Sequence, residues 1–304
     1  AKRDQFIAVG GAWRAIAKTH MHHVGYSLHV LQSYTIPTAE AVAFCTELLD
    51  KKGKLQMLAK NVAGRRVNNL PLTAHVLKAV LEESAAKSLV ISAYGLREGI
   101  VFSEMPDDFK RLDPLLAGVT SLAKPDSGQA GFSKSLNDFL RKVLATLEPV
   151  FVDAPEQEER LIAASFILAD IGAMMHPDHR ADIARQLVLR GPYTGIDHVG
   201  RVFLGLISAF RYSRKFLPTE LEVTVLTSEQ IERARVIAHL VRVATEFSGR
   251  TERILRRGYL SVSDGYLNLH VRPQNQQLVS EGVEKRLSQA ASLLGLEPRI
   301  AGPV

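Results

Sequence analysis

The chain has 304 residues, of which 46% are hydrophobic and 23% are charged, and its formal net charge is +6. This length predicts two or three domains, since single cores rarely exceed about 250–300 residues. No apolar run reaches the roughly 18–20 residues that span a bilayer, and the single Cys45 excludes an internal disulfide or a cysteine-based zinc site.

The basic charge balance, with an isoelectric point near 9.4, favours anionic partners such as phosphates, polyphosphate or nucleic acid. The sequence shows no zinc-finger spacing, RRM aromatics or basic-region zipper, so we expect no nucleic-acid partner. Residues 1–4 lead directly into an apolar run without a charged-then-apolar leader. We therefore expect a cytoplasmic protein that does not contact a membrane.

The chain begins with a pattern typical of phosphate-binding α/β proteins. Residues 5–9 form a short apolar run that Gly10 and Gly11 end, and helical spacing begins at Ala12. Glycines let backbone N–H groups approach an anion, and the N-terminus of the following helix adds partial positive charge. The pattern favours a phosphate site, although a simple strand-to-helix turn has the same sequence.

Two further helices and a strand are predicted next. One helix begins at Thr38, a good N-cap that follows Pro37, and another covers residues 70–84. The apolar run at 88–92 indicates a buried strand. Residues 1 to about 103 are therefore expected to be α/β.

The pattern changes near Met105. Residues 123–128 combine Gly, Pro and Ser and predict a surface loop. From Phe132 to Phe247 every strong segment has helical period, and the apolar segment 161–168 indicates a helix buried on all sides. This part is expected to be an all-helical domain.

The end of the chain has mixed character. Residues 259–262 and 266–271 alternate with period two across a turn that contains Gly265, which predicts a β-hairpin. A helix is predicted over residues 276–294, before Gly295.

The sequence of the first hundred residues resembles the Ppx/GppA phosphatase family, which comprises exopolyphosphatases and guanosine-pentaphosphate phosphohydrolases. Residues 9–17 are similar to that family's second glycine loop, Val-Gly-Gly-Thr followed by Arg-Ala-Leu-Ala. Residues 26–31 are similar to its Tyr-Pro-Leu-His segment, and residues 65–71 to the arginine before its long helix. Residues 89–99 carry its strand followed by Gly-Leu-Arg-Glu-Gly. The four matches occur in the family's order and spacing.

The resemblance implies a phosphate-binding role for Gly10, Gly11, Ala12 and Arg14. Ala12 stands where the family usually has threonine, so a hydroxyl contact is lost here. Arg14 either pairs with phosphate or lies on the helix surface.

The turn with Arg97 and Glu98, between Gly95 and Gly99, is implied to lie near the active cleft. Arg97 is a second phosphate-binding candidate there, although we favour a structural ion pair with Glu98.

Basic residues provide candidates for binding a longer polyanion. Lys60, Arg65 and Arg66 precede the helix at 70–84, and Arg211 stands in the helical domain where the family often has His-Arg. These residues either line an anion channel or form a solvated basic face.

The helical domain resembles the family's HD-like domain, in which histidines and aspartates bind metal. The family's His-Asp-Ile-Gly is replaced by a segment in which Ala169 precedes Asp170. Because the imidazole is lost, we expect no metal here and expect Asp170 to cap a helix or to pair with an arginine. His176 and His179 are close in sequence, but Pro177 between them argues for a loop.

The resemblance implies an α+β multidomain protein. Residues 1–105 correspond to part of the second actin-like (ribonuclease H-like) lobe, 106–248 to the HD-like helical domain and 249–304 to a small α/β domain. The family's first lobe, its Asp-Gly-Gly-Gly-Ser loop and its catalytic glutamate have no counterpart in this sequence. We therefore expect no catalytic residue in this chain.

The implied activity is hydrolysis of a terminal phosphate from polyphosphate or guanosine pentaphosphate, with Mg²⁺ serving the intact enzyme and with a homodimeric assembly. This chain is expected to be a truncated and inactive part. The alternative is a non-catalytic module that binds polyphosphate, dimerises and carries a degenerate HD site. An active HD phosphohydrolase is disfavoured by Ala169.

Overall fold

The computed structural model describes residues 4–50, 54–123 and 131–302. The predicted loop at 123–128 lies outside this range except for Ala123. The chain forms two compact units. The N-terminal unit comprises residues 1–112 and 196–198, and the C-terminal unit comprises residues 113–195 and 199–304. Among the described residues, no helix is both long enough and apolar enough to cross a membrane.

A three-stranded sheet lies at the centre of the N-terminal unit, in the order β1-β3-β2. The strands are β1 (Gln5–Val9), β2 (Tyr34–Pro37) and β3 (Ser88–Ser92). β1 and β3 run parallel, with Val9 opposite Ser92, and β2 is antiparallel to β3. The predicted strands at 5–9 and 88–92 are confirmed. β2 was not predicted, because its four residues are too few for a periodic pattern.

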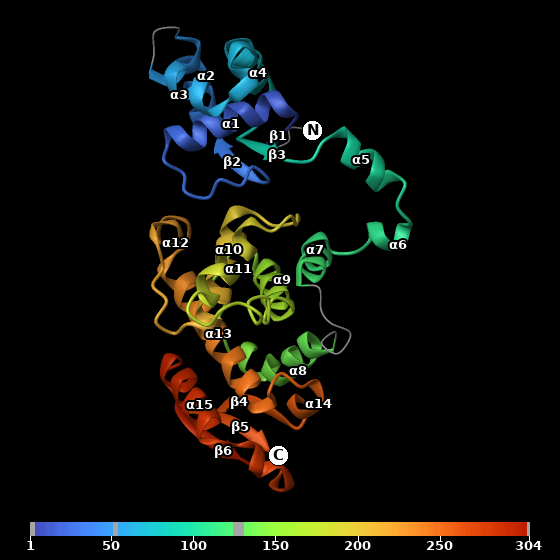
Figure 1. Ribbon diagram of the computed structural model, residues 1–304, viewed down its shortest axis with the longest axis vertical. Coiled ribbons are helices and arrows are strands. Elements are labelled where there is room, and N and C mark those ends of the chain that lie inside the picture. The colour runs from blue at the N-terminus through green and yellow to red at the C-terminus, as the bar shows by residue number, and fades with distance from the viewer. Residues whose placement is uncertain (1–3, 51–53, 124–130, 303–304) are drawn as a thin grey trace. The chain divides into compact units, whose positions relative to one another are not determined.

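Helices of the N-terminal unit gather beside this sheet (Figure 1). The predicted helices beginning at Thr38 and covering 70–84 are confirmed. The helices are α1 (Gly11–His23), α2 (Thr38–Leu49), α3 (Lys54–Val62) and α4 (Leu70–Ser84), and the 3₁₀ helix η1 (Gly64–Asn69) precedes α4. Their apolar faces and the inward-facing side chains of the sheet form one core that includes Ile16, Phe44, Leu77 and Leu89. Trp13 is partly buried against this core.

The N-terminal unit leaves apolar side chains exposed on β1 and on the segment that follows β3. Ile7 and Val9 on β1 are 60% and 49% exposed. None of the residues of α5 (Leu96–Ser103) and α6 (Asp107–Lys110) is buried, and Val101 and Phe102 are more than half exposed.

The C-terminal unit is mostly helical. Helices α11 and α13 supply much of its core, including Phe203, Phe210 and Leu240, none of which is exposed. α13 begins after Thr227, whose hydroxyl accepts from the Gln230 N–H at 3.3 Å, and ends at Gly249. The helices are α7 (Pro114–Ala123), α8 (Phe132–Leu144), α9 (Pro155–Ile167), α10 (Arg180–Arg190), α11 (His198–Tyr212), α12 (Glu220–Val225), α13 (Ser228–Ser248) and the short α14 (Glu252–Leu255).

Buried ion pairs lie inside this unit. Arg185 on α10 contacts Glu222 on α12 at 2.5 Å, with side-chain exposures of 7% and 0%. Burial alone would raise the pKa of Glu222, but hydrogen bonds from Arg185 and Thr219 outweigh burial and lower that pKa. Glu158 on α9 forms a similar pair with Arg233 on α13. These pairs tie together helices that are distant in sequence.

The end of the chain adds a small sheet with the order β4-β5-β6. β4 (Gly258–Ser263) and β5 (Tyr266–Val271) form the predicted hairpin, and β6 (Glu297–Ala301) runs parallel to β5. The turn uses positive φ angles at Asp264 and Gly265, 53° and 79°. These strands belong to the same compact unit as the helices. The division at residue 248 into separate domains therefore stays a prediction.

The last helix begins later than predicted. The sequence pattern placed its start at residue 276, but residues 273–278 form the 3₁₀ helix η2 (Pro273–Leu278), and α15 covers Glu281–Leu293. The hydroxyl of Ser280 accepts from the Val283 N–H at 3.4 Å and caps the helix. The cap sets the start, and the apolar pattern alone did not indicate it.

Candidate anion-binding site

The glycine pair lies at the carboxyl end of β1, where it joins α1. Gly10 has a φ of 132°, a backbone angle that side chains with a Cβ rarely adopt. Because β1 and β3 are parallel and paired in register, the loop after β3 lies beside this turn. The carboxyl edge of parallel strands is the usual position of ligand sites in open α/β sheets.

Arg14 joins these two neighbouring loops. Its guanidinium Nη1 donates a hydrogen bond to the carbonyl oxygen of Ala93 at 3.1 Å. This contact uses part of the side chain to hold α1 against the loop that leads to Gly95. Arg14 therefore makes a structural hydrogen bond, which the sequence did not indicate.

Arg66 lies directly over Gly11. A Cβ placed on Gly11 would stand 2.3 Å from Nη2 and 2.5 Å from Cζ of Arg66. The absence of a side chain at Gly11 thus lets the guanidinium rest against the backbone at the start of α1. The first N–H groups of a helix have no partner within the helix. The guanidinium of Arg66 therefore lies beside the hydrogen-bond donors at the start of α1.

A hollow of about 310 Å³ opens beside this contact. Its polar lining comes from Arg66, Asn69 and Thr73, and Ala12 and Ala15 of α1 form the opposite side. The Thr73 hydroxyl donates to the Asn69 carbonyl at 2.9 Å, which leaves its oxygen lone pairs to accept hydrogen bonds. Among the described residues that line the hollow there is no carboxylate, so the hollow favours an anion.

In the turn around Arg97, the acidic residue Glu98 has a structural function. The Glu98 carboxylate accepts a hydrogen bond from the Gly95 N–H at 2.6 Å and so caps α5. This hydrogen bond, together with a smaller effect of the Arg97 and Arg14 charges, lowers the pKa of Glu98. Arg97 itself is exposed beside this cap.

The remaining predicted polyanion residues are not among the described residues that line the hollow. Lys60 is exposed on α3 and is not among the residues that line the hollow. The side chain of Arg65 lies outside what the structure describes. Arg211 belongs to the C-terminal unit. The structure therefore brings together Gly11, Ala12 and Arg66 from the predicted set.

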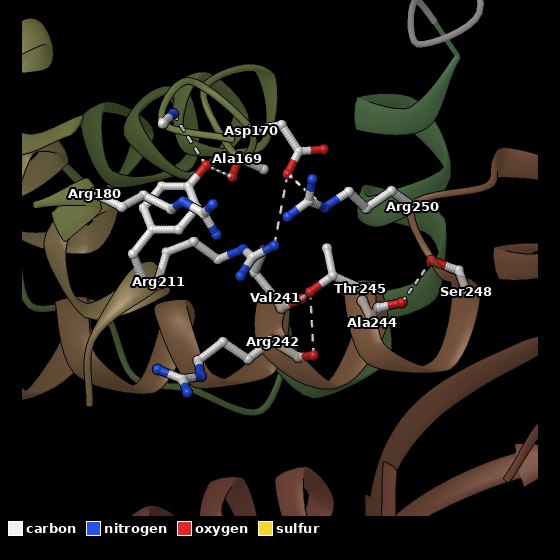
Figure 2. Close-up of polar contacts among 12 residues, drawn as sticks. Ala169, Asp170, Arg180, Arg211, Val241, Arg242, Ala244, Thr245, Ser248 and Arg250 are labelled. Carbon is white, nitrogen blue, oxygen red and sulfur yellow. Dashed lines mark hydrogen bonds and ion pairs between the residues drawn. The ribbon is translucent and has the colours of Figure 1, made fainter. Parts of the chain in front are cut away.

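Arg211 is an internal residue of the C-terminal unit (Figure 2). Its side chain is 11% exposed and lies 3.6 Å from the carboxylate of Asp170, which also contacts Arg250 at 3.3 Å. Burial lowers the pKa of the Arg211 guanidinium, and the nearby Tyr212 and Asp170 oppose that effect. The prediction that Asp170 pairs with a neighbouring arginine is confirmed.

Tyr212 completes this arrangement. Its hydroxyl accepts from the Gly172 N–H at 3.0 Å and donates to the Ala169 carbonyl at 3.2 Å. The segment that resembles the HD motif is thus anchored by a tyrosine and two arginines. Within the described ranges, no group of three or more His, Cys, Asp or Glu side chains is arranged to hold a metal ion.

One polar network around the buried His20 was not predicted. His20 on α1 hydrogen-bonds through Nδ1 to the Tyr34 hydroxyl at 2.8 Å, and its Nε2 lies 3.1 Å from the carboxylate of Glu40. Burial lowers the pKa of His20, although the Glu40 charge partly opposes this. The network joins α1, the helix that follows the glycine loop, to β2 and α2. No sequence signal relates these three positions, since the contact depends on tertiary packing.

The site thus combines a glycine turn at the end of parallel strands, an arginine against that turn and a hollow with no carboxylate among its described lining residues. Residues 2–108 match the family described as "Ppx/GppA phosphatase family", and residues 117–300 match "Exopolyphosphatase, C-terminal". The chain therefore belongs to the Ppx/GppA phosphatase family, as its sequence motifs predicted, and a phosphatase-type function follows. A search of curated proteins gave no match.

Members of this family are in general metal-dependent, and the donors around the hollow can be compared with what Mg²⁺ needs. Mg²⁺ binds through carboxylates and phosphate oxygens in octahedral geometry. The polar lining here consists of an arginine, an amide and a hydroxyl, and Glu98 is committed to the Gly95 N–H. The described residues of this site therefore do not fit a protein-held Mg²⁺.

Proposed function

We propose that this chain contributes the phosphate-holding part of a phosphohydrolase that removes the terminal phosphate of polyphosphate or guanosine pentaphosphate. The observation that carries the proposal is the position of Arg66 against Gly11, beside a hollow with no carboxylate among its described lining residues. Family membership supports a phosphatase-type activity, and the terminal-phosphate specificity is our inference.

Each part of the site has a role in this proposal. The N–H groups at the start of α1 donate to phosphoryl oxygens, and Arg66 offers two parallel donors that match the same oxygens. Asn69 and Thr73 supply uncharged hydrogen bonds at the rim. Phosphoryl transfer depends mainly on positioning and charge stabilisation, which are the contributions that such a site makes.

The described residues that line this hollow include no Asp or Glu that could act as a base for the attacking water. Residues 1–304 are therefore expected to bind a phosphate chain without hydrolysing it. The assay is phosphate release from inorganic tripolyphosphate with Mg²⁺. Turnover at the ordinary enzyme rate of about 1–100 s⁻¹ would show that the base lies within this chain.

Gly11→Ala tests the binding role itself. The added Cβ would displace the guanidinium of Arg66, since it would stand 2.3 Å from Nη2. Gly99→Ala is the matched control, because a Cβ there has no neighbour within 4 Å. We expect Gly11→Ala to weaken tripolyphosphate binding by about tenfold or more, given about 1.5–3 kcal/mol for charged hydrogen bonds, and Gly99→Ala to leave it unchanged. Equal affinities for both variants would remove the basis of the proposal.

A second candidate is a non-catalytic module that binds polyphosphate and dimerises. The pairing of Asp170 with Arg211 and Arg250 favours it, because this carboxylate is not free to hold a catalytic metal. Retained binding without phosphate release, even after the family's other lobe is supplied in trans, would support this candidate. Light scattering of residues 1–304 in solution tests the proposed homodimer.

A further inference from the structure

A serine and a histidine meet on one face of the small sheet at the end of the chain. Ser261 on β4 pairs with Asn268 on β5, and Tyr259 pairs with His270. Side chains two residues apart on a strand point to the same face, so Ser261 and His270 are diagonal neighbours there. The Oγ of Ser261 lies 2.8 Å from Nε2 of His270. A hydroxyl and an imidazole therefore share a hydrogen bond at this position.

The backbone determines which nitrogen of His270 carries the proton. β6 runs parallel to β5, and Ala301 is the register partner of His270. The carbonyl oxygen of the next residue, Gly302, lies 2.9 Å from Nδ1 of His270. A carbonyl is an acceptor, so Nδ1 bears the hydrogen of the neutral ring and Nε2 accepts from the Ser261 hydroxyl. The Gly302 carbonyl thus has the orienting role that a carboxylate has in a Ser-His-Asp triad.

Aromatic stacking holds the imidazole in place. The His270 ring stacks on the Tyr259 ring, with centroids 4.3 Å apart and planes 11° apart. The Lys142 ammonium on α8 lies 4.2 Å from the centroid of the same Tyr259 ring. His270 is 7% exposed, whereas Ser261 is only partly buried, so a small molecule can reach the hydroxyl. A nucleophile, a base and an orienting acceptor within hydrogen-bond reach form the arrangement that activates a serine.

Arg299 brings positive charge to the same row of the sheet. Asn268 pairs with Ser261 on one side and with Arg299 on β6 on the other. The Nε of Arg299 donates to Oδ1 of Asn268 at 2.5 Å, and its Nη2 lies 4.0 Å from the carboxylate of Asp264, which is 82% exposed. Such an exposed ion pair is weak, so the guanidinium can also contact an anion. A cation beside a nucleophile stabilises the charge of a phosphoryl group under attack.

We propose that Ser261 is a nucleophile that His270 activates, and that it accepts a phosphoryl group from a phosphoric anhydride. Oγ of Ser261 attacks phosphorus while its proton passes to Nε2 of His270. The Oγ–P bond forms as the bond from phosphorus to the leaving oxygen breaks, and the His270 imidazolium gives the proton to that oxygen. No atom is oxidised or reduced. The product is a phosphoserine at position 261, and the glycine loop takes no part in the reaction.

Acetyl phosphate, the mixed anhydride of phosphoric and acetic acids, is the donor in the test, because it has an electrophilic phosphorus and an electrophilic carbonyl carbon. Residues 1–304 are incubated with it, and peptide mass spectrometry locates the adduct. We expect a phosphoryl group on Ser261. An acetyl group on Ser261 would overturn the phosphoryl assignment. No adduct on Ser261, or adducts spread equally over the serines of the chain, would overturn the proposal as a whole.

Matched serine variants test the geometry. Ser263 lies on the same strand and face, but its hydroxyl accepts from Nδ2 of Asn268 at 3.1 Å. We expect Ser261→Ala to lose the adduct and Ser263→Ala to keep it.

His270→Gln removes the base and should slow the reaction by about 100-fold at an unchanged melting temperature. A rate equal to that of the unaltered protein would contradict the role of His270. Should His270→Gln lower the melting temperature, the extents of modification of Ser261 and Ser263 in the unaltered protein still decide. Equal modification of the two serines would overturn the proposal.

Discussion

The two units hold positive charge in different ways. In the N-terminal unit, Arg66 is exposed and rests against the backbone at Gly11, so the site depends on a close approach that only glycine permits. In the C-terminal unit, Arg185, Arg211 and Arg242 are inside or nearly inside the protein. The first two have carboxylate partners, and the third donates to the Phe210 carbonyl at 3.1 Å. The comparison teaches that buried arginines with partners inside the protein have structural roles, whereas an exposed arginine over a glycine backbone is accessible to a ligand.

Removing the partner of a structural arginine should have the largest effect. Glu222→Ala leaves Arg185 buried without its carboxylate, and the loss of one member of a buried pair costs about 3–5 kcal/mol. We expect chemical denaturation to show this loss in the C-terminal unit. Glu232→Ala is the control, since its carboxylate is 60% exposed and such surface pairs contribute about 0–1 kcal/mol. Equal losses for both variants would mean that burial does not distinguish these pairs.

Gly10→Val should have the next largest effect, this time on the N-terminal unit. Valine is strained at a φ of 132°, which costs about 1–3 kcal/mol and distorts the turn that presents the helix N-terminus. We expect lower stability together with weaker tripolyphosphate binding at the glycine loop. Trp13 is the single tryptophan of the chain and packs against the N-terminal core, so its fluorescence reports on this unit. An unchanged fluorescence transition would show that the turn tolerates a side chain.

A smaller, pH-dependent effect is expected from His20. Burial lowers the pKa of His20 in the folded state below its ordinary value of 6.5, so the unfolded chain takes up the proton first. Stability of the N-terminal unit should therefore be constant above about pH 6.5 and should fall as the pH drops below it. Denaturation followed by Trp13 fluorescence between pH 5 and 8 measures this loss. His20→Gln, which cannot titrate, should flatten the profile, and an equally steep profile would assign the effect to other groups.

The smallest effect concerns the salt dependence of binding to long polyphosphate. Basic residues that neutralise a dense line of negative charge release counter-ions, so affinity should fall steeply as salt rises. Arg65→Ala/Arg66→Ala should flatten that slope. The titration uses labelled polyphosphate at two salt concentrations, with a neutral polymer as control. An affinity that does not change with salt concentration would mean that these arginines form only a solvated face.

Much of the fold could be predicted because local signals agree with the tertiary structure. The strands at 5–9 and 88–92 are apolar runs bounded by turns, and the helix at 70–84 has proline in its first turn. Where a local cap competes with an apolar pattern, as at Ser280 before α15, the pattern misplaced the start of the helix.

The site could be predicted only in part. Gly10 and Gly11 were indicated by the strand–glycine–helix order, but the contact of Arg66 with Gly11 depends on how η1 packs against α1. An arginine partner for Asp170 was predicted, but its identity as Arg211 was not, because the two residues lie on segments distant in sequence.

The central claim is that Arg66 and the glycine turn hold a phosphoryl group. The most direct measurement is calorimetric titration of inorganic tripolyphosphate into residues 1–304, with and without Arg66→Gln. Lys60→Gln, an exposed residue on neighbouring α3, is the control. We predict that Arg66→Gln weakens the binding by about 10- to 100-fold, as expected for loss of a charged, two-donor contact, and that Lys60→Gln changes it less than twofold. Equal affinities for Arg66→Gln and Lys60→Gln would contradict the claim.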